Sequence, residues 1–173
     1  MYLFIIRHAI AEEREEFARK NTDDSLRPLT SKGRKKHQKM ILSLEKEFEK
    51  LDLIVTSPYL RAKQSAQIVS ELTDSTKIVE SAELVPHAPP QSLVKWLKTH
   101  CGGHKKVAVI GHEPHITSFA SYLLSGSDKE SFIEMKKSAV ALVEIGSFED
   151  LTPSKAKLQW RSEERRVGKE CRS

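Results

Sequence analysis

Short apolar runs alternate with amphipathic stretches along most of the chain. Residues 2–6, 51–55, 77–79 and 106–110 have the length of strands, and the continuous apolar runs among them are typical of strands covered on both faces. Helices are predicted between and after them, over about residues 31–50, 59–72, 91–99 and 116–124. Two closing strands are predicted at residues 138–145 and 157–160.

Strands that alternate with helices indicate an α/β fold, with a mainly parallel central sheet and helices on both faces. In such sheets, ligands bind beyond the carboxyl ends of the strands. Arg7 and His8 follow the first predicted strand, residues 57–61 follow the second, and Gly111 and His112 follow the fourth. The pattern therefore predicts that these polar clusters share one rim of the sheet.

The length of 173 residues fits a single domain, predicted to cover residues 1–160. Residues 161–173 carry eight charged residues and almost nothing apolar, so we expect them to lie outside the fold. This segment is either a native disordered tail or a non-native peptide appended by a vector. It contributes five basic and three acidic residues to the net charge of +5, which leaves +3 on the body. That charge suits an anionic substrate and does not call for nucleic acid.

Cysteine usage and hydropathy bear on the compartment. Cys101 and Cys171 form no CxxC pair, which argues against a disulfide framework or a thiolate metal site. No apolar run reaches the ~18 residues of a membrane-spanning helix, so no membrane association is predicted. Residues 1–6 lack a basic leader and read as a buried strand rather than a signal peptide. A cytoplasmic location is the expectation.

Four motifs in order carry a family resemblance. They are Phe4-Ile-Ile-Arg-His-Ala9, Arg27-Pro-Leu-Thr30, Ser57-Pro-Tyr-Leu-Arg-Ala62 with Gln64, and Gly111-His-Glu-Pro114. Together they resemble the histidine phosphatase superfamily, with Ala9 where glycine is usual, and the short chain is similar to its SixA branch. The resemblance spans about residues 1–160. It implies a phosphoglycerate mutase-like fold, no cofactor, a role in signal transduction, and a phosphorylated histidine phosphotransfer domain as partner.

The same resemblance assigns the central roles. It implies that His8 is the nucleophile and that Arg7, Arg61 and His112 bind the phosphoryl oxygens. The chemistry agrees, because a neutral imidazole accepts phosphoryl groups well and covalent catalysis divides one displacement into two easier steps. Nearby arginines disfavour imidazolium and match a tetrahedral oxyanion. A hydrogen bond to the other ring nitrogen must fix the tautomer of His8, and the sequence does not name its partner.

Three further residues have two interpretations each. Arg27 either reaches the phosphate or forms a structural salt bridge. Ser57 either donates a hydrogen bond near the site or caps the helix that follows it. Glu83 lies in a segment that is shorter than the insertion from which larger relatives draw their general acid. It is therefore either that acid or an exposed loop carboxylate.

The remaining histidines are not expected to react. His37 stands among lysines and is predicted to lie on an exposed helical face. His112 and His115 have the spacing of half a metal site, but no third ligand completes it, so no metal is predicted. The same reading applies to His87, His100 and His104.

Three functions remain open at this stage. The first is hydrolysis of phosphohistidine on a protein, which a weak or absent general acid favours because a protonated imidazole leaves readily. The second is hydrolysis of small phosphomonoesters, for which Glu83 would matter. The third is a binding module that keeps an anion pocket without catalysis, since the methyl group of Ala9 could crowd the backbone.

Overall fold

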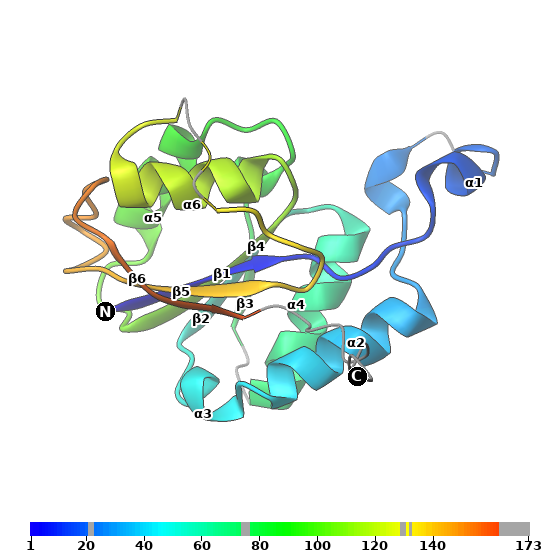
Figure 1. The fold of residues 1–173 in the computed structure, drawn as a ribbon, viewed down its shortest axis with the longest axis horizontal. Helices are drawn as coiled ribbons and strands as arrows, with labels where there is room; N and C mark the ends of the chain where they lie inside the picture. Colours follow the sequence, from blue (N-terminus) through cyan, green and yellow to red (C-terminus); the bar gives the residue numbers. More distant parts are fainter. Residues whose placement is uncertain (21–22, 74–76, 129–130, 132, 163–173) are drawn as a thin grey trace, which may run out of the picture.

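The computed structural model describes residues 1–20, 23–73, 77–128, 131 and 133–162. One six-stranded sheet has the order β3-β2-β4-β1-β5-β6 (Figure 1). Its first four strands are mutually parallel, β5 is antiparallel to β1, and β6 is antiparallel to β5. The strands are β1 (Tyr2–Arg7), β2 (Leu53–Thr56), β3 (Ile78–Glu80), β4 (Lys106–Gly111), β5 (Val140–Glu144) and β6 (Lys157–Ser162). The predicted α/β fold with a mainly parallel sheet is confirmed.

Helices cover both faces of the sheet (Figure 1). One face carries α2 (Ser31–Leu42), α3 (Glu45–Phe48) and α4 (Leu60–Thr73), and the other carries α5 (Pro90–His100) and α6 (His115–Ser125). Three short helices lie in the connections: α1 (Arg14–Ala18), η1 (Asp24–Leu26) and η2 (Ala82–Leu84). None of the helices in the described part of the chain is long and apolar enough to cross a membrane.

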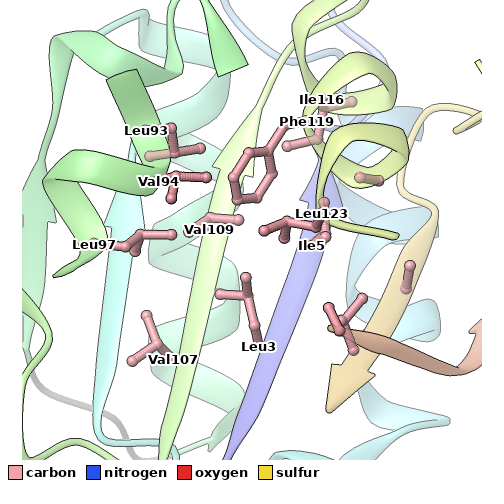
Figure 2. Packing of buried hydrophobic residues seen from close by; sticks show 14 of the residues in the cluster. Leu3, Ile5, Leu93, Val94, Leu97, Val107, Val109, Ile116, Phe119 and Leu123 are labelled. Carbon is pink, nitrogen blue, oxygen red and sulfur yellow. The ribbon is translucent and has the colours of Figure 1, made fainter. Parts of the chain in front are cut away.

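The core lies in two layers because successive residues of a strand point to opposite faces. Leu3 and Ile5 of β1 pack with Leu93 of α5 and Phe119 of α6 in the layer that Figure 2 shows. Phe4 and Ile6, from the same strand, belong to the other layer, which packs under α2, α3 and α4. All four of these β1 side chains are at most 1% exposed, so β1 is buried on both faces, as its unbroken apolar run predicts.

Backbone pairing brings the polar segments to one end of the sheet. Strand β4 lies between β2 and β1, so the three strands that precede the polar clusters are neighbours. The amide of His8 donates to the carbonyl of Gly111 at 3.1 Å, and the amide of Ser57 donates to the carbonyl of Ile110 at 3.0 Å. These bonds extend the strand pairing beyond the sheet and fix the starting points of all three segments next to one another.

A close backbone approach anchors the loop after β1 to the start of α2. Thr30 caps α2 by accepting a hydrogen bond from the amide of Gly33 at 2.9 Å, and the amide of Thr30 donates to the carbonyl of Ile10 at 3.0 Å. A Cβ atom on Gly33 would lie 2.1 Å from that carbonyl oxygen. Only glycine fits there without a shift of the backbone, so the contact holds residues 8–11 in place.

Several predicted boundaries differ from the structure. The helix predicted over residues 31–50 ends at Leu42, where the hydroxyl of Ser43 donates to the carbonyl of Met40 at 2.7 Å and takes up an acceptor of the last turn. A separate short helix, α3, follows. Strand β6 runs to Ser162, two residues beyond the predicted domain boundary. The rest of the predicted tail, residues 163–173, lies outside the described residues.

The prediction for His37 is wrong. Its side chain is fully buried rather than exposed, because α2 packs against α4 with the ring beside the backbone of Ser65. Burial lowers the pKa of His37 to about 4, and the contact with Ser65 acts in the opposite direction. The ring is therefore neutral at neutral pH and serves as a core residue.

Candidate active site

His8 lies at the end of β1 with only 6% of its surface exposed. Its Nδ1 atom is 2.6 Å from the carbonyl oxygen of Ala9. A carbonyl can only accept a hydrogen bond, so Nδ1 carries the proton and Nε2 keeps a lone pair. Burial lowers the pKa of His8 to about 3, the bond to Ala9 acts in the opposite direction, and the charges of Arg61, Arg7 and Arg27 lower it further. The side chain is thus a neutral imidazole whose Nε2 is available as a nucleophile.

Ala9 fits without crowding. Its side chain is fully buried in a small apolar cluster with Ala11, Leu29 and Ile68. Its amide donates to the hydroxyl of Ser65 at 3.0 Å. The methyl group therefore fills space between the loop and α4 and does not displace the carbonyl that fixes the tautomer of His8.

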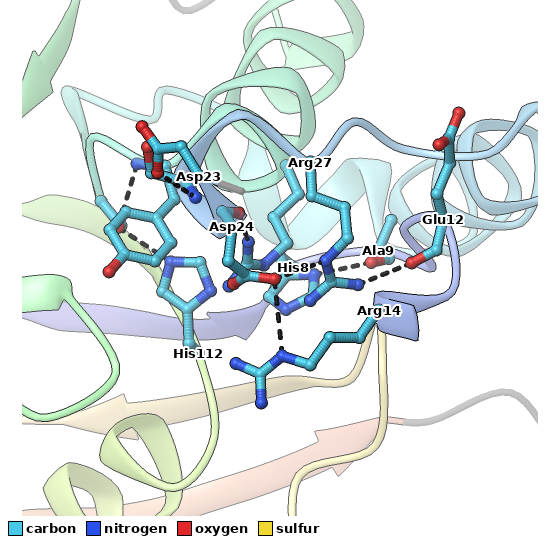
Figure 3. A network of polar contacts seen from close by, with 12 residues as sticks. His8, Ala9, Glu12, Arg14, Asp23, Asp24, Arg27 and His112 are labelled. Atoms are coloured by element: carbon cyan, nitrogen blue, oxygen red, sulfur yellow. Dashed lines mark hydrogen bonds and ion pairs between the residues drawn. The ribbon is translucent and has the colours of Figure 1, made fainter. Parts of the chain in front are cut away.

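His112 faces His8 across the site. The two ring centroids are 4.9 Å apart, at an angle of 52°. The Oγ atom of Ser57 lies 2.8 Å from Nε2 of His112 and accepts a hydrogen bond from the amide of Tyr59 at 3.3 Å. The Ser57 hydroxyl hydrogen has no other acceptor among the described residues, so it is donated to Nε2 of His112. The proton of His112 then lies on Nδ1, on the side of the ring that faces His8 and Asp24 (Figure 3).

His112 is also neutral. It is 1% exposed, and burial lowers its pKa to about 2, with further contributions from His8 and Arg61. Its Nδ1 atom is buried and has no partner among the described residues. A buried N–H without an acceptor is costly, and an anion beside His8 would satisfy it. Ser57 bonds to His112 and also accepts a hydrogen bond from the amide of Tyr59 just before α4.

Arg7 and Arg61 bring two guanidinium groups close to His8. Nη1 of Arg7 donates to the carbonyl of Met135 at 2.7 Å, and Nη1 of Arg61 donates to the carbonyl of Asp24 at 2.8 Å. The Nε atoms of both arginines are buried without a partner among the described residues. Burial lowers the pKa of each guanidinium, but arginine remains charged at working pH. Each guanidinium group is thus held by a backbone carbonyl through Nη1, and its buried Nε–H group has no partner among the described residues.

Arg27 joins the cluster through Asp24. Its Nε atom donates to Oδ1 of Asp24 at 2.8 Å, and its Nη1 atom donates to the carbonyl of Glu12 at 2.6 Å. Arg61 contacts the other carboxylate oxygen of Asp24 at 3.0 Å. Arg27 is close enough to lower the pKa of His8, so it forms a salt bridge and also belongs to the positive field of the site. Figure 3 shows this network around His8.

Glu83 lies in η2 and is partly exposed. Its carboxylate acts on His115, where burial lowers the pKa to about 4 and Glu83 opposes that change. The described residues contain no hydrogen bond or ion pair between Glu83 and His8, Arg7, Arg61 or His112. They also contain no group of three or more His, Cys, Asp or Glu residues that could hold a metal ion.

Two carboxylates and one aromatic ring at the site were missed from sequence. Asp24 bridges the arginines, Glu113 neighbours Arg7, and Tyr59 packs against both His112 and Arg61. Burial raises the pKa of Glu113, while a hydrogen bond from Thr117 at 2.6 Å and the charge of Arg7 lower it. The position of Glu113 directly after His112 was a usable signal. Asp24 offered no such signal, because only the fold brings it to Arg61.

The arrangement can stabilise a tetrahedral anion beside a nucleophile. The neutral imidazole of His8 has a fixed tautomer. Near it, the Nε–H groups of Arg7 and Arg61 and the Nδ1–H group of His112 lack a partner among the described residues. These are fixed donors in a water-poor site, where electrostatic stabilisation of developing charge is strongest.

Comparisons with known proteins show what this chain is similar to. The model of the histidine phosphatase superfamily (branch 1) matches residues 3–85, which include His8, Arg27 and Arg61. The phosphohistidine phosphatase SixA of Escherichia coli strain K12 is 28% identical over 152 residues, covering 85% of this chain and 89% of SixA. A Picosynechococcus protein without an assigned function is 27% identical over 150 residues, covering 85% of this chain and 87% of its own length.

Solved structures share the fold. The protein histidine phosphatase SixA in complex with tungstate superposes with a TM-score of 0.77 at 24% identity, covering 93% of this chain and 96% of that one. A mycobacterial glucosyl-3-phosphoglycerate phosphatase gives a TM-score of 0.65 at 14% identity, with 91% and 96% of the two chains covered.

Proposed function

Because this chain belongs to the histidine phosphatase superfamily, we propose that it is a phosphohistidine phosphatase that takes a phosphoryl group onto Nε2 of His8 and passes it to water. The observation that carries the proposal is the hydrogen bond of 2.6 Å from Nδ1 of His8 to the carbonyl of Ala9. This bond leaves the lone pair on Nε2 of His8, as a nucleophile requires.

The first step transfers the phosphoryl group to the enzyme. The lone pair of His8 Nε2 attacks phosphorus, and a bond from Nε2 to phosphorus forms while the substrate's bond from phosphorus to nitrogen breaks. The electron pair of that bond leaves with the substrate imidazole, which takes up a proton and departs neutral. The positive charge that develops on the His8 ring is shared with Nδ1–H and stabilised by the Ala9 carbonyl.

The second step returns the site to its starting state. Water attacks the phosphorus of phosphohistidine 8, loses its proton, and the bond from phosphorus to Nε2 breaks. The electron pair returns to Nε2, so inorganic phosphate leaves and the imidazole is again neutral. The low pKa of His8 supports both steps: the free ring stays unprotonated and nucleophilic, and the phosphorylated ring leaves as a neutral, weakly basic imidazole.

In this proposal, the phosphoryl oxygens are bound by the donors of the site that lack a hydrogen-bond partner. The Nε–H groups of Arg7 and Arg61 and the Nδ1–H group of His112 are the buried donors without a partner among the described residues of the site. Removing one such donor from a site of this kind costs about 3 kcal/mol of barrier. Arg27 contributes charge at longer range.

A phosphorylated protein is the proposed substrate. SixA, a relative of nearly the same length, is named as a phosphohistidine phosphatase. An imidazole leaving group needs less help from a general acid than an alkoxide does. The carboxylate in contact with the arginines, Asp24, has a lowered pKa and is ionised at neutral pH, so it is not a proton donor there. We propose a histidine phosphotransfer domain as the partner, acting in signal transduction in the cytoplasm.

A phosphatase of small phosphomonoesters is the second candidate. The fold likeness to a glucosyl-3-phosphoglycerate phosphatase and the raised pKa of Glu113 beside Arg7 favour it. A carboxyl group of raised pKa is the kind of proton donor that an ester leaving group requires.

The test compares turnover of a phosphorylated histidine phosphotransfer domain with turnover of a panel of small phosphate esters. We expect kcat/KM to be at least about a hundredfold higher for the phosphoprotein. In the same assay, Glu83→Gln is expected to lower phosphohistidine hydrolysis less than about tenfold. Higher kcat/KM on an ester, together with a loss of several orders of magnitude in Glu83→Gln or Glu113→Gln, would establish the ester phosphatase instead.

A further inference from the structure

Asp24 joins two arginines of the site, Arg27 and Arg61. Its Oδ2 atom is 3.0 Å from Nη2 of Arg61, and its Oδ1 atom accepts from Nε of Arg27 at 2.8 Å. Its backbone carbonyl also accepts from Nη1 of Arg61 at 2.8 Å. The exposed Arg14 makes a longer contact with Oδ1, at 3.5 Å. Figure 3 shows Asp24 between His8, Arg27 and His112.

The contacts with Asp24 fix the guanidinium group of Arg61 in a buried position. Both Nη atoms of Arg61 bond to Asp24, one through the carboxylate and one through the carbonyl, while its Nε atom has no partner among the described residues. The guanidinium group is planar, so two fixed nitrogens determine where the third one points. The side chain of Arg61 is 4% exposed, which leaves little room for another rotamer.

We propose that Asp24 is a positioning residue for phosphoryl binding: it holds the guanidinium groups of Arg61 and Arg27 beside His8, where their positive charge stabilises a phosphoryl group. The proposal rests on the proposed function for its substrate but concerns binding of the anion itself. Asp24 also separates two like charges, because Arg27 and Arg61 would otherwise repel each other at close range. It touches neither the nucleophile nor the substrate and acts through the arginines.

A competing interpretation predicts the opposite sign. A carboxylate beside an anion site repels the anion, so an Asp24 that merely neutralised the arginines would weaken oxyanion binding, and its removal would strengthen it. An Asp24 that positions Arg61 strengthens oxyanion binding, and its removal weakens it. The direction of the change in affinity therefore distinguishes the two roles.

The chain offers a matched control in the neighbouring carboxylate. Asp23→Asn and Asp24→Asn make the same change of charge and shape one residue apart. Asp23 caps η1 by accepting from the amide of Ser25 at 2.9 Å, a bond that an asparagine side chain also makes. Both variants remove one carboxylate charge, and Asp24→Asn removes the one that contacts Arg27 and Arg61.

The experiment measures the dissociation constant of tungstate, a tetrahedral oxyanion, by calorimetry on the full chain. We expect Asp24→Asn to bind tungstate about tenfold more weakly and Asp23→Asn to stay within about twofold of the unchanged protein. For Asp24→Asn, kcat/KM on the phosphoprotein should also fall. Asp24→Glu should restore part of the lost tungstate affinity. Unchanged or tighter tungstate binding in Asp24→Asn would overturn the proposal.

Two measurements keep the result independent of folding and of the proposed substrate. Circular dichroism melts show whether Asp24→Asn is folded, and if it is not, the loss of tungstate affinity is read from Asp24→Ser. The tungstate measurement needs no turnover. Failure of the phosphohistidine assay with normal tungstate binding would count against the proposed substrate, whereas equal tungstate affinity in the two asparagine variants would count against the role of Asp24.

Discussion

Replacing Ser57 by alanine removes the only group that fixes the tautomer of His112 among the described residues. Ser57 is fully buried, His112 is 1% exposed, and their hydrogen bond is 2.8 Å long. Without the hydroxyl, Nε2 of His112 becomes a buried polar atom that water does not reach. Neither the position of the proton nor the orientation of the ring is then fixed, so Nδ1–H is no longer held toward the phosphoryl group.

The size of the effect follows from the burial of both partners. Loss of one partner from a buried hydrogen bond costs about 1–3 kcal/mol. If most of this cost falls on the transition state, in which the anion is bound most tightly, kcat/KM drops by a factor between roughly five and 150, since about 1.4 kcal/mol corresponds to a tenfold change in rate. Ser57 lies between β2 and α4, and alanine is smaller than serine and fits the same backbone, so the fold should persist.

The assay is kcat/KM on the phosphorylated partner domain, together with the tungstate dissociation constant. Ser121→Ala is the control, because it removes an equally buried hydroxyl from α6 outside the His8–His112 pair. We expect Ser57→Ala to lose roughly tenfold to a hundredfold in kcat/KM, and Ser121→Ala to change the melting temperature more than the rate. A Ser57→Ala rate within about twofold of the unchanged protein would refute the assignment of the His112 proton to Nδ1.

Two further predictions concern stability. Gly33→Ala places a Cβ atom 2.1 Å from the carbonyl oxygen of Ile10, so urea unfolding should show that the free energy of unfolding falls by about 1–3 kcal/mol. Gly146→Ala is the control, because a Cβ atom there has no atom within 4 Å, and it should change the free energy of unfolding little. Equal effects of the two variants would contradict the close approach at Gly33. The buried His37 has a pKa of about 4 against 6.5 in the unfolded chain, so between these values the unfolded state binds more protons and stability falls as the pH falls. At pH 5 this amounts to about 2 kcal/mol, and His37→Gln should show a smaller loss between pH 7.5 and pH 5 than the unchanged protein; an identical loss would argue against a neutral buried ring.

The fold could be predicted because the apolar runs of its strands are visible in the sequence. The unbroken apolar run of residues 2–6 requires burial on both faces, and the alternation of strands and helices then leaves few topologies. The split of the predicted helix over residues 31–50 could not be seen in the apolar spacing, because it depends on a local bond from Ser43 to the carbonyl of Met40. For His37 the signal was present, since it lies four residues after Gly33 and four before Ile41, both buried on the same face of α2.

The candidate site was predictable as far as its residues follow strand ends. His8, Ser57 and His112 do so, and the pairing of three neighbouring strands brings them together. The partner of His8 Nδ1 is the carbonyl of the next residue, which side-chain chemistry cannot indicate. Asp24 reaches Arg61 across 37 residues of sequence, in a turn of 3₁₀ helix that no periodicity marks. Its role follows from tertiary structure alone.

The phosphorylated nitrogen is the most direct test of the mechanism. The protein is mixed with phosphorylated partner domain, quenched in base within the first turnover, and digested for mass spectrometry and nuclear magnetic resonance of the phosphopeptide. We predict a phosphoryl group on Nε2 of His8, because Nδ1 is committed to the Ala9 carbonyl, and no adduct or turnover in His8→Ala. A phosphoryl group on Nδ1 or on another residue, or near-normal turnover by His8→Ala, would contradict the account.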